Sequence, residues 1–330
     1  MKKEYSYIDF LKVIGLFCII LAHVNPPSII MQLRNFDVPL MVVLSGFLVF
    51  NNNYTCNGGG YNYLKKRLTR LVIPVWIFLC LYFSALYVAT GNFDIKLVIK
   101  SFCFQQDSIG YVWIIWVYVI VAMMTFPMLK LYDRYGKFFV LIYMFIYFLY
   151  ELAVLLGIGL TSRFFIYTIY YAVPYGLISL FGLLYSTLSW KRKILVAVGF
   201  ILIFAFLAIF FSFRKGAFVP TQDFKYPPRI YWISYAVGVS YLLMLVCEHL
   251  EPCFLFDNFV IRFIGRNTLW IYLWHIPFIL ISLHITDKWF IRFLIVALGA
   301  VSIDFFQLKV VGTIENSFEK IKNITKFLHG

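Results

Sequence analysis

Charged residues are scarce in this chain, and their scarcity argues against a water-soluble globular fold. Only 13% of the 330 residues are charged, whereas 62% are hydrophobic. Soluble domains carry about a quarter charged residues and slightly under half apolar ones. A soluble core cannot bury such an excess of apolar side chains, but lipid can surround it. No polar stretch is long enough for a separate soluble domain, so we expect a single transmembrane domain over residues 1–330.

Patterns for metal binding and for a disulfide framework are also missing. The six cysteines form no C-x-x-C pair and none lies near a pair of histidines, so we expect neither a zinc site nor any other metal. The net charge is +14, but no basic stripe lies on a soluble element, and nucleic acid is therefore not an expected partner. The positive-inside bias of membrane proteins accounts for such a charge.

Long apolar runs are abundant instead, and they predict an all-α polytopic membrane protein. A bilayer core of about 30 Å requires roughly 20 apolar residues per helix, so the length accommodates about ten spans. The run 193–211 is apolar on every face, as expected for a helix that contacts lipid. The predicted spans are 8–24, 36–50, 71–90, 111–129, 138–158, 164–186, 194–213, 230–248, 266–284 and 289–311.

The basic residues predict the orientation. The first apolar stretch contains Asp9 and Lys12 and lacks a small-x-small cleavage site, so we interpret it as a retained helix and not a signal peptide. With the N-terminus inside, 18 of the 29 Lys and Arg residues fall on the inside and 10 on the outside. Both termini are therefore predicted to be cytoplasmic. Segment 214–229 then faces outward, and segment 249–265 faces inward with an expected interfacial helix that places Phe254, Phe256, Phe259 and Phe263 against lipid.

Two candidate functional residues lie in the first predicted helix. Lys12 and His23 are eleven residues apart, which places them about 20° from eclipsed and about 16 Å apart along the axis. One interpretation is a snorkelling lysine and a histidine at the helix end. The other is the wall of a tunnel, in which Lys12 attracts an anionic group and His23 serves as a general base.

Two arginines precede the third predicted span. Arg67 and Arg70 are three residues apart and therefore share a helical face. Paired guanidinium groups suit phosphate, which they bind in a bidentate manner. The alternative is an ordinary basic anchor at the inner surface.

A third group follows Gly265, where a helix entry leads to a histidine well inside a span. Tyr272 and His275 belong to this group, and the alternative to a functional role is a histidine bonded to a neighbouring helix. Glu151 and Asp304 also fall inside predicted spans. Such residues usually have a partner or a function, and here they either pair with basic groups or accept protons.

In this order, these motifs resemble acyltransferase family 3, the bacterial membrane enzymes that O-acylate carbohydrates. The resemblance rests on Lys12-x10-His23, the segment Pro39–Phe47 with its Leu44-Ser45-Gly46-Phe47, Arg67-x-x-Arg70 with Ile73-Pro74, and Tyr272-x-x-His275-x-Pro277. It extends from the first predicted helix to the ninth. Met41 and Val42 stand where the family usually has phenylalanines, an apolar exchange.

The resemblance implies a stand-alone member, without an appended extracytoplasmic domain, in the bacterial cytoplasmic membrane. Acyl-CoA, most often acetyl-CoA, would donate the acyl group. A lipid-linked or polymeric surface glycan such as O-antigen or capsule would accept it. Arg67 and Arg70 would bind the donor phosphates, with Lys12 lining the same path, and His23 would be the catalytic base or acyl relay. Ser45, Tyr272 and His275 are the candidates for contacting substrate or the developing oxyanion.

Two other functions compete with this interpretation. A transporter or flippase for a glycan or small anion would use the same intramembrane charges as a relay. No convincing internal repeat accompanies them, although many transporters carry one. A non-catalytic membrane scaffold would leave the shared face of Lys12 and His23 unexplained.

Overall fold

The computed structural model describes residues 6–51, 59–92, 94–106, 108–109, 111–159, 162–251, 256, 258–317, 325 and 327–329. Within these ranges all regular elements are helices and no strand occurs, which confirms the predicted all-α class. The order is α1 (Ser6–Ala22), α2 (Ser28–Leu33), α3 (Asp37–Asn51), α4 (Gly59–Thr90), α5 (Ile95–Phe102), α6 (Ile114–Tyr135), α7 (Lys137–Leu155), α8 (Arg163–Tyr167), α9 (Ile169–Thr187), α10 (Trp190–Lys215), η1 (Thr221–Phe224), α11 (Ile230–His249), α12 (Phe259–Arg266), α13 (Thr268–Ile285) and α14 (Trp289–Ser317).

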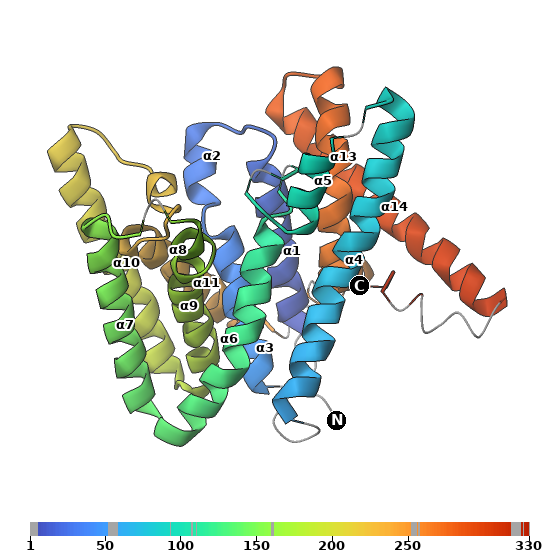
Figure 1. The fold of residues 1–330 in the computed structure, drawn as a ribbon. Helices are drawn as coiled ribbons and strands as arrows, with labels where there is room; N and C mark the ends of the chain where they lie inside the picture. Colours follow the sequence, from blue (N-terminus) through green and yellow to red (C-terminus); the bar gives the residue numbers. More distant parts are fainter. Residues whose placement is uncertain are drawn as a thin grey trace.

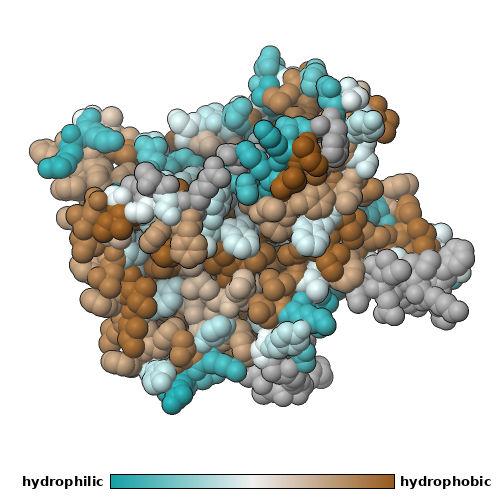
Figure 2. Space-filling model, in the orientation of Figure 1, coloured by the Kyte–Doolittle hydropathy of each residue, from teal (hydrophilic) through white to brown (hydrophobic). Residues whose placement is uncertain are grey.

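The long helices form a bundle that crosses a membrane several times. Nine helical segments in the described ranges are long and apolar enough to span a bilayer. Helix α1, with 17 residues, packs within the bundle against α3, α12 and α13, and counting it gives the predicted ten. Figure 2 shows apolar surface over the middle of the bundle and more hydrophilic surface at its two ends. The protein is therefore a multi-pass membrane protein.

The two ends of the bundle differ in the elements that they carry. Figure 1 shows α2 and α5 near one end and the turn between α6 and α7 at the opposite end. The charge bias predicts that the end with α2 is outside, and we call it the outer end. The end with the turn between α6 and α7 is the inner end.

Helix α3 lies at the centre of the bundle and packs closely on α9. A Cβ atom at Gly46 would collide with the backbone of Ser179, and one at Gly182 would collide with the backbone of Val43. Small residues at such contacts let membrane helices approach closely. By contrast, α10 is largely exposed and presents Leu202 and Phe206 on its surface, as expected for a helix that contacts lipid.

Several predicted boundaries were wrong. Helix α4 begins at Gly59, twelve residues before the predicted start of the third span, because Tyr63 packs on Val49 and Leu129 and so continues the apolar face. The basic motif therefore lies inside the helix and not before it. The short helices α2 and α5 were not predicted, since each has too few residues for a periodic pattern.

Segment 249–265, where we expected an interfacial helix, contains the helix α12, and one phenylalanine of the segment differs from the prediction. Phe259 is 71% exposed, as expected for a lipid contact. Phe256 is instead buried and packs on Phe10 of α1. Phe254 lies outside the described residues.

Candidate active site

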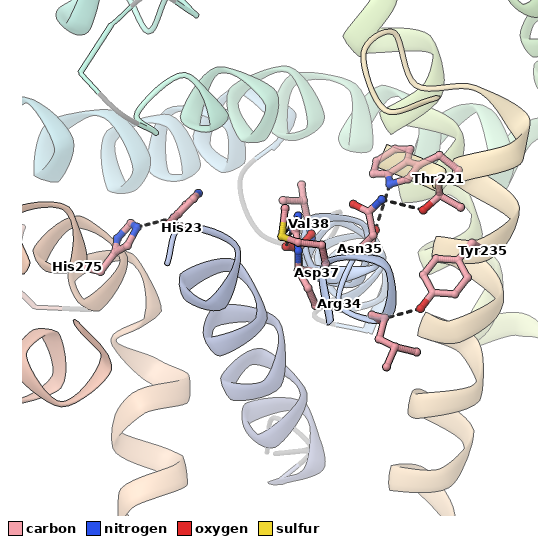
Figure 3. A network of polar contacts seen from close by, with 11 residues as sticks. His23, Arg34, Asn35, Asp37, Val38, Thr221, Tyr235 and His275 are labelled. Atoms are coloured by element: carbon pink, nitrogen blue, oxygen red, sulfur yellow. Dashed lines mark hydrogen bonds and ion pairs between the residues drawn. The ribbon is translucent and has the colours of Figure 1, made fainter. Parts of the chain in front are cut away.

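The structure brings two of the predicted histidines together at the outer end of the bundle. His23 directly follows α1, and His275 lies in the middle of α13. The Nδ1 atom of His23 lies 2.9 Å from Nε2 of His275. Figure 3 shows this contact between the two imidazoles as a dashed line. His275 is completely buried, and the ring of Tyr111 stacks on His23 with 3.4 Å between the centroids. Both imidazoles are thus fixed in place.

The hydrogen bonds of this pair define the tautomers of the neutral imidazoles. The Nδ1 atom of His275 bonds to the carbonyl of Tyr272, and a carbonyl can only accept, so this nitrogen carries the proton. The Nε2 atom of His275 is then an acceptor, and His23 must donate from Nδ1. The remaining nitrogen of His23, Nε2, consequently has a lone pair available for an incoming proton.

His23 lines a cavity of about 260 Å³ at the outer end. The wall combines residues that are far apart in the sequence. It includes Ile19, Ala22, His23, Met31, Arg34, Asp37, Val38, Tyr111, Trp113, Ile114, Gln222, Lys225, Tyr226 and Tyr272. Aromatic walls with a few polar groups are typical of small-molecule sites.

A buried ion pair forms one side of the cavity. Arg34 and Asp37 are joined at 2.6 Å, and their side chains are only 5% and 1% exposed. The second carboxylate oxygen of Asp37 accepts from the backbone N–H of Val38 at 2.7 Å. Asp37 is therefore satisfied at the first turn of α3, where a carboxylate is favourable for the helix dipole.

Lys225 forms the opposite part of the wall and is nearly as buried, with 5% exposure. Its ammonium lies 5.6 Å from the ring centroid of Tyr226 and 5.9 Å from that of Trp232. Such cation–π contacts contribute about 0.5–2 kcal/mol. Removing an ammonium group from water costs several kcal/mol, which these contacts do not offset.

Hydrogen bonds between remote segments hold this wall together, as Figure 3 shows. Asn35 donates to Thr221 at 2.8 Å, and Trp232 donates to the carbonyl of Asn35 at 3.1 Å. Tyr235 donates to the carbonyl of Leu33 at 2.7 Å. The segment between α2 and α3 is thereby fixed to η1 and α11, which places Arg34 and Lys225 on the same cavity.

The outward loop is held at its other end by Glu151 of α7. Glu151 accepts from the hydroxyl of Tyr147 at 2.7 Å, from Nε of Arg229 at 3.2 Å, and from the backbone N–H of Ile230. Of the two alternatives left open for Glu151, the structure shows the pairing with a basic group. Asp304 on α14 is completely buried, and neither carboxylate oxygen has a hydrogen-bond partner in the described part of the chain.

Lys12 lies apart from this cavity, on the inner half of α1. Its ammonium pairs with Asp9 at 2.8 Å, and Arg266 of α12 lies 3.7 Å from the same carboxylate. The predicted shared face with His23 overlooked Asp9, which lies one helical turn from Lys12 and supplies the partner.

The two arginines of α4 differ in their surroundings. Arg67 is half-buried and donates to Ser45 of α3 at 3.2 Å, and its Nε has no hydrogen-bond partner among the described residues. Arg70 is exposed. Ser45 therefore lies beside Arg67 and not among the residues that line the His23 cavity, and the rise from Asp37 to Ser45 along α3 is about 12 Å.

Sequence reasoning missed part of the site. Arg34 and Asp37 were not singled out, although an arginine three residues before an aspartate at the start of an apolar helix is the spacing of a helical ion pair. Tyr111 and Trp113 gave no signal, because aromatics at a helix entry are common in membrane proteins. Groups of His, Cys, Asp and Glu that could hold a metal are absent from the described ranges.

The fold and this site define a multi-pass membrane protein with a histidine pair at an outer cavity. The model of the family described as "Acyltransferase domain" matches residues 5–303, nearly the whole chain. The chain belongs to this family, acyltransferase family 3, and is an acyltransferase. No curated protein and no solved structure matches it.

Proposed function

We propose that the protein transfers an acyl group, first of all acetyl, from cytoplasmic acyl-CoA to a hydroxyl of a surface carbohydrate. The observation that carries this proposal is the His23–His275 pair beside a cavity, in a chain that belongs to an acyltransferase family. The bacterial cytoplasmic membrane is the corresponding location, with the acceptor reaching the cavity from outside.

His23 is the general base in this proposal. Its Nε2 takes the proton of the acceptor hydroxyl while that oxygen attacks the thioester carbonyl. When the carbon–sulfur bond breaks, the imidazolium returns the proton to the leaving sulfur, so that an ester and a free thiol result. General acid–base catalysis of this kind contributes typically 10²–10⁴-fold.

His275 is a positioning residue in the same scheme. It accepts the Nδ1 proton of His23, and its own Nδ1 is occupied by the carbonyl of Tyr272. This hydrogen bond orients the imidazole and favours the tautomer with the lone pair on Nε2, which is the role that an orienting group has in hydrolase triads. The buried position of His275 also keeps water away from the hydrogen bond on its side of the pair.

We place the acyl donor, which is a substrate, along α3, between Arg67 near the inner end and the His23 cavity at the outer end. The thioester supplies the activated acyl group, and Arg67 binds a phosphate of the donor through its unsatisfied Nε and neighbouring nitrogens. Tyr118 of α6 lies one turn below Ile114, which lines the cavity, and its buried hydroxyl has no hydrogen-bond partner in the described ranges. The hydroxyl of Tyr118 is therefore a polar group between Arg67 and the cavity.

The test is acyl transfer by the His23→Ala variant. We expect release of free CoA thiol and acylation of extracted surface glycan to fall by at least a hundredfold. The matched control is His284→Ala, because His284 is an exposed histidine on α13 that bonds only within its own helix. Wild-type glycan acylation by His23→Ala, measured by mass spectrometry at equal membrane expression, would contradict the catalytic role.

The same assay separates the transporter alternative. A transporter would move an unmodified glycan or anion without consuming acyl-CoA. Uptake or flipping in vesicles that contain no acyl-CoA, unchanged in rate by His23→Ala, would favour that function.

A further inference from the structure

The cavity beside His23 carries an unbalanced positive charge. Three charged side chains line it, namely Arg34, Asp37 and Lys225. Arg34 and Asp37 neutralise each other at 2.6 Å, so the charge of Lys225 remains. The ammonium of Lys225 forms no hydrogen bond or ion pair with the described residues, and it lies 5.6 and 5.9 Å from the ring centroids of Tyr226 and Trp232.

This arrangement is unusual for a structural lysine. A lysine that is 5% exposed is normally paired, because an ammonium has three N–H donors that ring faces leave without acceptors. Lys193 provides an internal comparison. It is also buried, it contacts the ring of Tyr185 at 4.1 Å, and it donates to both carboxylate oxygens of Glu248 at 2.8 and 2.9 Å.

Asp37 does not serve as the missing partner of Lys225. One of its oxygens accepts from Arg34 and the other from the backbone of Val38. Asp37 thus fixes Arg34 against the cavity wall, and Lys225 keeps donors for something that enters the cavity. The wall therefore has the composition of an anion site with aromatic sides.

We propose that the acceptor carries an anionic group, a carboxylate or a phosphate, and that Lys225 binds this group while His23 activates a nearby hydroxyl. This inference rests on the proposed function, since it names the class of acceptor for the same cavity. It makes Lys225 a specificity-determining residue. The cavity volume of about 260 Å³ suits one charged sugar residue of a longer glycan.

The binding test compares one neutral sugar with two anionic sugars, one of which carries a carboxylate and the other a phosphate. The probes are methyl β-glucuronide, methyl β-glucoside and glucose 6-phosphate, titrated into the purified full chain by calorimetry. We expect one of the two anionic probes to bind at least tenfold more tightly than the glucoside, and the stronger one identifies carboxylate or phosphate as the group. Equal affinity for the three probes, or no binding of either anion, would overturn the inference.

Variants of Lys225 test whether this residue binds the anionic probe. Lys225→Met keeps the length of the side chain and removes the charge, so affinity for the anionic probe should fall at least tenfold while that for the glucoside stays constant. Lys215→Met is the matched control, because Lys215 is exposed at the end of α10 and does not line the cavity. Lys225→Arg should retain binding of the anion, and its gel-filtration profile provides a check on folding. Unchanged anion affinity in Lys225→Met would refute the assignment.

The pH dependence gives a second readout. Burial lowers the pKa of Lys225 to about 8, and Asp37 and Arg34 oppose each other in their effects on it. Lys225 is therefore cationic below pH 8 and becomes neutral above it, so anion affinity should decrease between pH 7 and 9.5. The other titratable groups that line the cavity are His23, Tyr111, Tyr226 and Tyr272, and burial raises the pKa of Tyr226, which stays neutral in this range. A constant anion affinity over this range would contradict the role of Lys225.

The two proposals fail in different ways. If transfer to a neutral glycan proceeds at the wild-type rate in Lys225→Met and no anion binds, the inference fails and the acyltransferase proposal stands. If an anionic probe binds through Lys225 but no thiol is released with any acceptor, the proposed transfer fails and the anion site stands.

Discussion

The two ends of α3 differ in the number and length of the hydrogen bonds that their polar side chains form. At the outer end, both carboxylate oxygens of Asp37 accept short hydrogen bonds, at 2.6 Å from Arg34 and at 2.7 Å from the backbone of Val38, although Nε of Arg34 has no partner among the described residues. Toward the inner end, Ser45 accepts a single bond of 3.2 Å from Arg67, whose Nε has no partner in the described ranges. The same helix thus joins a closely bonded region to a sparsely bonded one.

The difference has a functional consequence. A fixed geometry is required where the acceptor hydroxyl must meet the base, since small displacements of reacting groups reduce rates strongly. A phosphate-bearing donor needs charge more than fixed geometry at the inner end, where it enters and leaves in every cycle. The outer end of α3 therefore suits the chemical step, and the inner end suits exchange of the donor.

The largest expected effect on this comparison comes from removing the positive charge of Arg67 near the inner end. Charge-assisted hydrogen bonds contribute about 1.5–3 kcal/mol, so Arg67→Gln should raise the Kd for acyl-CoA about tenfold to a hundredfold. Arg70→Gln should have a smaller effect, within a few-fold, because Arg70 is exposed and salt screens its charge. Direct binding of CoA to the purified protein measures both.

Lys66→Gln serves as the control for these variants, since Lys66 is an exposed cation of the same helix. Losses of equal size in the three variants would indicate a diffuse basic surface and not a donor site at Arg67. The proposed donor site at the inner end of α3 would then have no support.

A smaller effect is expected from the outer end, where His275→Phe removes the acceptor for the Nδ1 proton of His23. One hydrogen bond contributes about 0.5–1.5 kcal/mol, so the transfer rate should fall up to about tenfold. Without that acceptor the imidazole of His23 is a weaker base, and the acidic limb of the pH–rate profile should move to lower pH. His275→Gln, whose side-chain oxygen can accept the same proton, should restore part of the rate.

A purely structural role of His275 would lower the amount of folded protein and leave the position of the limb unchanged. The profile of His275→Phe, recorded from pH 5 to 9 with purified enzyme, distinguishes these outcomes. His284→Ala, in the same helix, should reproduce the wild-type profile.

The sequence predicted the helices well, because lipid imposes a long apolar run on every span. The same pattern does not tell which residues of different spans meet. His23 and His275 are 252 positions apart, and their contact depends on the packing of α1 against α13. The shared face predicted for Lys12 and His23 is a property of one helix, and the actual partner of Lys12 is Asp9, one turn away.

The polar wall of the cavity was even less accessible to sequence analysis. Lys225 belongs to segment 214–229, which was predicted only to face outward, and its burial follows from bonds such as that between Asn35 and Thr221. Periodicity carries no information on such bonds between loops. Spacing did contain the signal for the pair of Arg34 and Asp37, which are three residues apart.

The smallest expected effect concerns Glu151, which fixes the outward loop from a distance. Glu151→Gln weakens the hydrogen bonds to Arg229 and to the backbone N–H of Ile230. Because the ion pair of Glu151 and Arg229 is partly exposed, the free energy of unfolding should decrease by only about 1 kcal/mol. We expect the Tm of the purified protein to decrease by a few degrees, and KM for the acceptor to rise more than kcat falls, because the loop carries Lys225 and not His23. Asp133→Asn, an exposed substitution on α6, is the control. A decrease in kcat at constant KM would place Glu151 in the chemical step. Glu151 would then not act by fixing the cavity wall that carries Lys225.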